Sequence, residues 1–137
     1  MTNVDLAAAY LSKARSRLDV LDLLIGKGAY SDVVREAQEI VELATKGMLR
    51  RVGVDPPKIH DVSGVILENR VRFPGVSDVE LDRLVAESKA LRRDRELSFY
   101  GDVDFIPTEE YSLIDAEKAR AAANFVVAIA GRIIAKG

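Results

Sequence analysis

Apolar residues recur every three or four positions along four long stretches of this chain, a spacing typical of one face of an α-helix. The first stretch shows it plainly, at Ala7, Leu11, Ala14, Leu18, Leu21 and Ile25. The pattern predicts a helix with Asn3 as its N-cap, and the glycines of "GKG", Gly26–Gly28, predict its end.

The second stretch repeats this spacing at Tyr30, Val34, Ala37, Val41, Ala44 and Met48. Ser31 can cap the exposed amides at its start, so we expect a second helix that runs to about Val52. Because only a tight turn separates the two helices, they should lie antiparallel.

Two prolines interrupt the helical pattern in "GVDPPK", Gly53–Lys58. Proline lacks an amide hydrogen and restricts the residue before it, so this segment should form a rigid elbow. The next residues, "HDVSGVILENRV", favour a short helix that ends at "FPG", Phe73–Gly75.

A third long helix is predicted by Ser77 and Glu80, which have the spacing of a capping box, and it should continue to about Leu97. A long loop, Ser98–Pro107, follows, after which Thr108 or Ser112 can cap the last helix. The apolar face of that helix is rich in alanine, at Ala119, Ala123, Val126, Ala130 and Ile133. The sequence therefore predicts one all-α domain over residues 1–137, an antiparallel four-helix bundle with one additional short helix.

The chain contains no cysteine, which excludes disulfide bonds, thiolate catalysis and thiolate metal ligands. No stretch approaches the roughly 20 apolar residues that span a bilayer, and the N-terminus lacks the basic region of a signal peptide. We therefore expect a cytoplasmic protein that does not bind membranes.

The charges are unevenly distributed, although the net charge is only −2. Basic residues outnumber acidic ones six to three from Lys46 to Arg72, and five to three from Arg83 to Glu96. Between Tyr100 and Glu117 there are six acidic residues and no basic one. These runs indicate either a positive surface that binds anions or ordinary solvated helix faces.

His60 is the only histidine, which limits the chemistry open to this fold. Di-metal sites in helical bundles need two Glu-x-x-His motifs, and a zinc site would need carboxylates from elsewhere in the chain. There is no glycine-rich phosphate loop, and the strip of Glu36, Glu39 and Glu42 has the spacing of a solvated helix face. We therefore expect no metal ion and no cofactor.

Two segments carry a more specific signal. One is "AYSDVVREAQEIVELATKGMLRRVGVDPPKIHDVSGVI", Ala29–Ile66, with its proline elbow and Lys-x-His-Asp motif. The other is "RRDRELSFYGDVDFIPTEEYSLIDAEKARAAANFVVAIA", Arg92–Ala130, with an arginine-rich helix end and a Tyr-Gly loop. In both, the chain resembles the HEPN domains (higher eukaryotes and prokaryotes nucleotide-binding).

This resemblance implies an antiparallel helical bundle, often dimeric and frequently paired with a minimal nucleotidyltransferase as toxin and antitoxin. Some members are metal-independent RNases, whose motif places a histidine roughly four to six residues after an arginine. Here eight residues separate Arg51 from His60, and two of them are prolines. The sequence departs from the catalytic motif, so we predict no catalytic residue.

We expect a HEPN-like protein, one of a toxin–antitoxin-like pair, that binds a nucleotide, RNA or a minimal nucleotidyltransferase. The residues predicted to bind the nucleotide or RNA lie at two bends of the chain: Arg51, Lys58, His60, Arg92, Arg95 and Tyr100. Together with Arg50 and Arg93 they are expected to form one anion-binding surface, provided that the two bends lie on the same side of the bundle.

Several alternatives stay open. The protein could be a metal-independent RNase toxin, or a homodimeric helical module with the alanine-rich last helix as its seam; a homodimer is expected in any case. His60 could be catalytic, could contact a ligand, or could be a polar bridge at the elbow with Asp61 nearby. The ring of Tyr100 could pack on the bundle or stack on a base.

Overall fold

A computed structural model describes residues 2–100 and 111–135, with the backbone alone from residue 94 to residue 100. The described elements are, in chain order, α1 (Asn3–Gly26), α2 (Tyr30–Arg51), α3 (Ser63–Glu68), the 3₁₀ helix η1 (Arg70–Arg72), α4 (Asp78–Tyr100) and α6 (Leu113–Ile134). The predicted all-α, antiparallel four-helix bundle with one additional short helix is confirmed.

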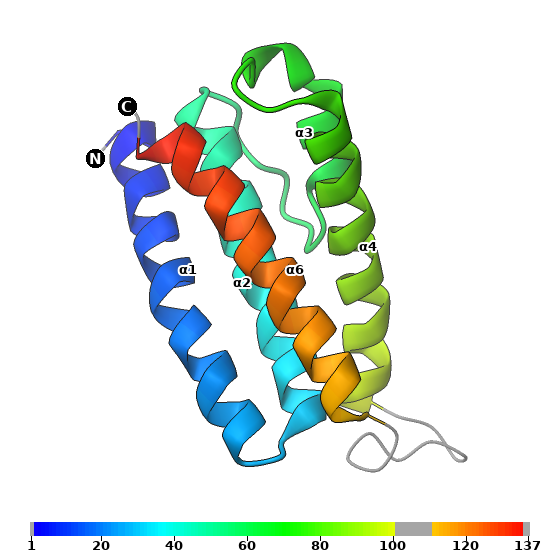
Figure 1. The fold of residues 1–137 in the computed structure, drawn as a ribbon. Helices are drawn as coiled ribbons and strands as arrows, with labels where there is room; N and C mark the ends of the chain where they lie inside the picture. Colours follow the sequence, from blue (N-terminus) through cyan, green and yellow to red (C-terminus); the bar gives the residue numbers. More distant parts are fainter. Residues whose placement is uncertain (1, 101–110, 136–137) are drawn as a thin grey trace.

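The four long helices lie side by side and alternate in direction along the chain (Figure 1). Helix α2 lies at the centre, because it packs against α1, α4 and α6. The ends of α2 and α6 therefore lie at one end of the bundle, together with the start of α4, and the end of α4 lies at the other. This arrangement decides which of the basic residues can meet.

The side chains of α2 are largely buried, as expected for the central helix of the bundle. Its large side chains at Ile40, Met48 and Leu49 have no exposed surface. Gly47 allows close packing at the end of the helix: a Cβ atom there would lie 3.1 Å from Ile134 Cδ1 and 3.2 Å from Tyr10 Cβ. A larger residue at this position would push α1 and α6 away from α2.

Helix α1 begins one residue earlier than predicted. Thr2, not Asn3, is the N-cap, and it forms a reciprocal capping box with Asp5. The end of the helix follows the prediction, because Gly28 adopts a φ of 72° and the amide of Ala29 bonds to the carbonyl of Leu24. This bond and the positive φ of Gly28 are typical of a Schellman motif, in which glycine is the preferred residue.

The predicted cap of α2 is wrong. Ala29 occupies the N-cap position without a side-chain hydrogen bond, and Ser31 lies inside the helix with 6% of its surface exposed. The two helices are so close in sequence that the Schellman turn of α1 leads directly into α2. Burial of the first turn replaces the capping bond that a serine would supply.

The segment predicted as one short helix is divided in two, α3 and η1, at Asn69. The Asn69 side chain donates to the carbonyl of Val65, an interaction that competes with helix continuation. Phe73 in the "FPG" turn is fully buried and anchors this corner to the bundle.

Helix α4 begins with the predicted capping box of Ser77 and Glu80, in which each side chain bonds to the backbone amide of the other residue. It ends three residues later than predicted, at Tyr100, so Ser98 and Tyr100 belong to the helix and not to a loop. The remainder of the predicted loop, and Thr108, lie outside the described residues.

Ser112 caps α6 through a capping box with Asp115, as one of the two predicted candidates. The alanine-rich face of α6 is used within the chain: Ala119, Ala123 and Ala130 are buried, and the helix packs on α2 and α1. This face thus lies in the core of one chain and is not available as the seam of a dimer, whereas the suggestion that α6 forms the seam stays a prediction for its other faces. A homodimer itself stays a prediction.

Within residues 2–100 and 111–135, none of the helices is both long and apolar enough to cross a membrane.

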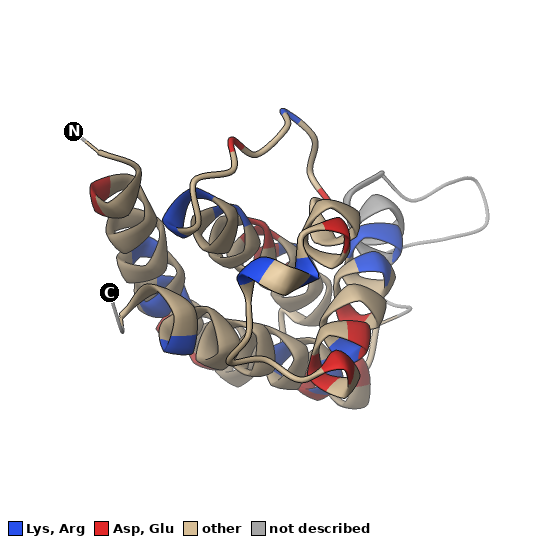
Figure 2. Ribbon diagram, turned by 90° about the horizontal axis from the view of Figure 1, so that it is seen from above, with Lys and Arg blue, Asp and Glu red and all other residues tan. Residues whose placement is uncertain are grey.

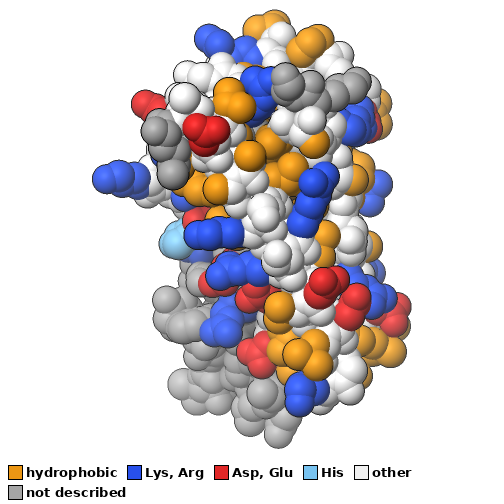
Figure 3. Space-filling model, turned by 90° about the vertical axis from the view of Figure 1, so that its left-hand side faces the viewer, with side chains coloured by type: hydrophobic (Ala, Val, Ile, Leu, Met, Phe, Trp, Pro, Cys, Tyr) orange, Lys and Arg blue, Asp and Glu red, His pale blue; other side chains and the backbone are white. Residues whose placement is uncertain are grey.

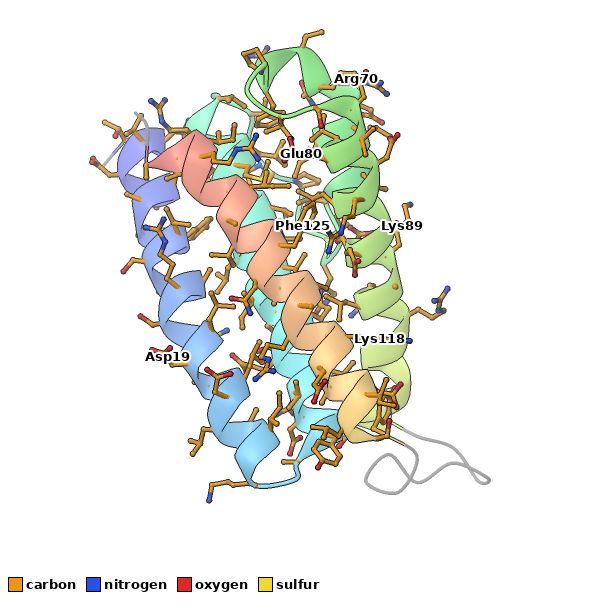
Figure 4. All side chains as sticks on the ribbon, in the orientation of Figure 1. Asp19, Arg70, Glu80, Lys89, Lys118 and Phe125 are labelled. Atoms are coloured by element: carbon orange, nitrogen blue, oxygen red, sulfur yellow. The ribbon has the colours of Figure 1, made fainter. Side chains whose placement is uncertain are left out.

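An ion pair joins the start of α4 to the end of α6. Arg132 lies 2.6 Å from Glu80 Oε2 and also donates to the carbonyl of Gly75. The hydrogen bond from Arg132, assisted by the amide of Ser77, lowers the pKa of Glu80 to about 2. The carboxylate thus serves the capping box and the helix–helix contact at once (Figure 4).

We predict that Glu80→Gln lowers the melting temperature at pH 7, because glutamine keeps the capping acceptor but loses the charge that Arg132 binds. Since the folded-state pKa of Glu80 is depressed, its contribution is present above the ordinary value of 4.5 and is lost as the pH falls towards 2. Melting curves of both proteins between pH 7 and 2 should therefore converge at the acid end.

Asp82→Asn is the matched control, because it removes an exposed α4 carboxylate with no ion pair to any described residue. Its melting temperature at pH 7 should equal that of the wild type. If the difference in melting temperature between the wild type and Glu80→Gln did not change with pH, the stabilising role of the ionised Glu80 carboxylate would be contradicted.

Candidate nucleotide-binding site

The elbow begins at a Schellman motif that ends α2. Gly53 adopts a φ of 80°, its amide bonds to the carbonyl of Arg50, and the amide of Val54 bonds to that of Leu49. The chain then leaves the helix axis and descends along the bundle before α3 begins (Figure 1). From above, it forms an arch beside the helices (Figure 2). The prolines that follow prevent any continuation of α2.

His60, just after the elbow, bonds to α2. Its Nδ1 atom lies 2.9 Å from Oε1 of Glu42, whose other oxygen lies 3.0 Å from Lys46 Nζ. Partial burial raises the pKa of Glu42, but the hydrogen bonds from His60 and Lys46 and the charge of Lys46 lower it by more, so the net shift is downward. Glu42 is thus an ionised anchor for the imidazole.

Asp61 makes the corresponding link to α4. Its Oδ1 atom accepts a hydrogen bond of 2.8 Å from the Ser88 hydroxyl and one of 3.0 Å from the amide of Ser63 at the start of α3. Partial burial raises the pKa of Asp61, but hydrogen bonds from Ser63 and Ser88 and the charge of Lys89 outweigh it, so the pKa is lowered. His60 and Asp61 together fasten this part of the chain to α2 and α4.

A hollow of about 270 Å³ lies beside the imidazole, lined by Arg17, Glu39, Glu42, Leu43 and His60. Arg17 is 3.6 Å from Glu36 and 3.5 Å from Glu39, so its charge is shared between two carboxylates. Burial raises the pKa of Glu36 despite the charge of Arg17. The strip of three glutamates is therefore neither a solvated face nor an acid/base pair: each carboxylate pairs with a cation.

The side chain of His60 is 54% exposed, and Figure 3 shows it at the edge of the molecule with acidic and basic side chains around it. This geometry fits the prediction that His60 is a polar bridge, since its ring joins the chain after the elbow to α2. The capping role lies with the neighbouring Asp61, which binds the first amide of α3.

The six predicted binding residues do not form one surface. Arg51 is at the end of α2, whereas Arg92, Arg95 and Tyr100 are in the second half of α4, towards the opposite end of the bundle (Figure 1). The condition that the two bends lie on the same side of the bundle is therefore not met, because the antiparallel helices α2 and α4 end at opposite ends.

Part of the set does come together. Lys58 and His60 lie close in sequence to Asp61, which bonds to Ser88. Arg92 lies one turn after Ser88 on the same face of α4, and Lys89 and Arg93 are exposed beside it. We call Lys58, His60, Lys89, Arg92 and Arg93 the elbow–α4 surface. The side chains of Arg95 and Tyr100 lie outside the described part of the chain.

Sequence reasoning did not assign Arg17, Glu42 and Ser88 to this region. Glu42 was visible only as one member of a periodic strip, and nothing in the local sequence of Arg17 or Ser88 marks either residue. Contacts between segments distant in sequence bring them together. Over the described residues, no group of three histidine, aspartate or glutamate side chains could hold a metal ion.

We predict that Asp61→Ala destabilises the protein by about 1–3 kcal/mol, because it leaves the buried Ser88 hydroxyl without its acceptor. His60→Ala should cost less than about 1 kcal/mol, since the His60 side chain that bonds to Glu42 is half-exposed. Because the pKa of Asp61 is depressed, its contribution should be present above the ordinary value of 3.8 and fade below it. Urea unfolding of both variants at pH 7 and pH 3 measures this.

Asp61→Asn is the matched control, because it retains a hydrogen-bond acceptor without the charge. Its free energy of unfolding at pH 7 should lie between those of the wild type and Asp61→Ala. A larger loss from His60→Ala than from Asp61→Ala would show that the bond to Glu42 is the more important anchor.

Comparison with known families agrees with the helical architecture. The sequence model of the HEPN domain matches residues 7–133, nearly the whole of the chain. No curated protein matches it. The match includes all four long helices and the elbow between α2 and α3. The chain belongs to the HEPN domain family.

Proposed function

We propose that this protein binds the phosphate groups of a nucleotide or RNA through the elbow–α4 surface, without cleaving its ligand. HEPN membership supports a nucleotide- or RNA-related function in general. The observation that carries the finer proposal is the bond between Asp61 and Ser88, because it holds the chain after the elbow against the basic half of α4.

The charges of this surface favour an anion. Lys58, Lys89 and Arg93 are exposed, and Arg92 is half-buried beside them. The nearby carboxylates are already engaged, Asp61 with Ser63 and Ser88, and Glu42 with Lys46 and His60. Arg95 continues the basic run along α4 by sequence, and Tyr100 offers a ring for stacking at the end of the helix.

The surroundings of His60 argue against catalysis. RNA cleavage by imidazole needs a cation that neutralises the charge developing on the phosphate. Arg17, the arginine in the hollow beside His60, is shared between Glu36 and Glu39.

An RNase toxin is the second candidate, and one observation favours it. Glu42 holds Nδ1 of His60, and a carboxylate at that position fixes the imidazole and leaves Nε2 as the atom that can exchange a proton. The exposure of the ring would give a substrate access to it.

The partner of this protein is a further part of the proposal. HEPN domains of this kind frequently pair with minimal nucleotidyltransferases, so we propose a cytoplasmic toxin–antitoxin-like pair with such an enzyme. A gene for a short nucleotidyltransferase beside that of this protein, followed by co-purification of the two products, would support this. Separate elution of co-expressed products would argue against it.

We predict that single-stranded RNA binds the protein with an affinity that falls steeply with salt, because phosphate contacts release counterions. Arg92→Ala with Arg95→Ala should weaken binding by about tenfold or more and reduce the salt slope. Fluorescence anisotropy at 50 and 200 mM salt, with thermal melts of each protein, gives both quantities.

The matched control is Lys13→Ala with Lys27→Ala, which removes two exposed charges from the α1 region. If both double variants weakened binding equally, the attraction would be a property of net charge and not of this surface.

We also predict that metal-free protein cleaves RNA no faster than a buffer blank. The reason is that Arg17, the arginine in the hollow beside His60, is already paired with Glu36 and Glu39. Incubation of labelled RNA with wild type and with His60→Ala tests this. Cleavage by the wild type that is lost in His60→Ala, with unchanged helicity, would favour the RNase toxin.

A further inference from the structure

We infer that a second anion site lies at the opposite end of the bundle from the basic half of α4, and that it takes a phosphomonoester. The site is a hollow of about 370 Å³ lined by Arg51, Val52, Arg72, Pro74, Gly75, Arg132 and Ile133. Its three arginines come from the end of α2, from η1 and from the end of α6. We call them the end-arginine cluster. It does not depend on the function proposed for the elbow–α4 surface.

Figure 2 looks onto this end of the bundle, where basic segments at the ends of α2 and α6 and on η1 surround the same region. The three segments are far apart in sequence, and antiparallel packing brings them together. Gly75 and Pro74 belong to the turn before α4, so backbone atoms form the rest of the lining.

Arg51 is the member that most needs an explanation. Its guanidinium makes no hydrogen bond or ion pair with any residue that the structure describes, and its Nε atom is buried without an acceptor. The neighbouring Arg50 also has a buried Nε atom without an acceptor, but the rest of its guanidinium reaches Asn3, Asp55 and the ring of Tyr10. Because the Nε atom of Arg51 is enclosed by protein, a ligand in the hollow would bind the terminal Nη donors of this guanidinium, which have no partner among the described residues.

The other two arginines are held in place by backbone carbonyls. Arg72 donates to the carbonyl of Val52 over 3.2 Å, and Arg132 donates to that of Gly75. Arginine has five N–H donors, so these bonds orient each guanidinium and leave donors for a ligand. Phosphate oxygens suit this planar arrangement, which can bind them in pairs.

The charge of the site selects the class of anion. Three guanidinium groups line the hollow, and Glu80, bound to Arg132, is the carboxylate that offsets one of them. The remaining two positive charges match a phosphomonoester, which carries about −1.5 to −2 at pH 7, better than a phosphodiester, which carries one. The monoester belongs either to a free nucleotide or to the 5′ end of an RNA.

A purely structural role accounts for part of this cluster. Cations at helix C-termini are stabilised by the helix dipole, and the bond from Arg72 to Val52 is an interaction of that kind. That role does not explain the convergence of three guanidinium groups on one hollow. Its volume lies within the range of about 300–1,000 Å³ that small ligands occupy.

The experiment measures binding of AMP and of inorganic phosphate by calorimetry, with thermal melts alongside. We expect both to bind the wild type, and Arg51→Met and Arg72→Met each to weaken binding by about tenfold. Binding should also weaken below about pH 6, where the phosphomonoester takes up its second proton. Arg72→Lys, which keeps the charge but loses the planar donors, should fall between Arg72→Met and the wild type.

Two controls separate this site from others. Arg120→Met removes an arginine that pairs with Asp22 on α1, outside the hollow, and should bind AMP as the wild type does. Arg92→Ala with Arg95→Ala, which tests the elbow–α4 surface, should also leave AMP binding at the end-arginine cluster unchanged. Loss of binding at the end-arginine cluster can thus be distinguished from loss of binding at the elbow–α4 surface.

RNA oligonucleotides that differ only at the 5′ end identify the source of the phosphate. Tighter binding of the 5′-phosphorylated form, lost in Arg51→Met, would assign the site to an RNA end, and AMP binding without this preference would assign it to a free nucleotide. Two results would overturn the inference. One is that AMP, inorganic phosphate and 5′-phosphorylated RNA all give no binding signal with the wild type above that of a buffer blank. The other is that folded Arg51→Met binds these ligands with the same affinity as the wild type.

Discussion

Burial of α2 on nearly all sides is the constraint on which the rest of this structure depends. A helix packed against three others cannot carry many solvent-exposed charges, so its polar residues must find partners across the bundle. Glu36 and Glu39 meet Arg17 of α1, and Glu42 meets the imidazole of His60. The conformation of the chain after the elbow is thus linked to the electrostatics of the central helix.

Antiparallel packing then distributes the basic residues. Because α2 and α6 end together and α4 ends at the other end of the bundle, arginines near helix C-termini collect in two places (Figure 1). The helix dipole favours the arginines at the ends of α2 and α6, whereas the last turn of α4 holds no basic residue. What distinguishes the end-arginine cluster is that Arg51 has neither a carboxylate nor a carbonyl partner among the described residues, in contrast to Arg50 beside it.

The sequence was sufficient to predict the elements but not the contacts between them. Apolar spacing and the capping box of Ser77 and Glu80 are local signals, and both were confirmed. The cap at Ser31 failed because burial decided the start of α2. The bond between Asp61 and Ser88 spans 27 residues, and the hollow at Arg51 needs α6, so neither has a signature in a short stretch of sequence.

The net charge of −2 is compatible with anion binding at both sites, because charge acts locally in salt solution. Interactions between exposed charges are largely screened beyond about 8–10 Å at physiological ionic strength. A carboxylate that already holds an arginine or a lysine therefore has little effect on a phosphate at the far end of the bundle. Affinity at the end-arginine cluster should depend on Arg51 above all, since its charge is not offset by any described carboxylate.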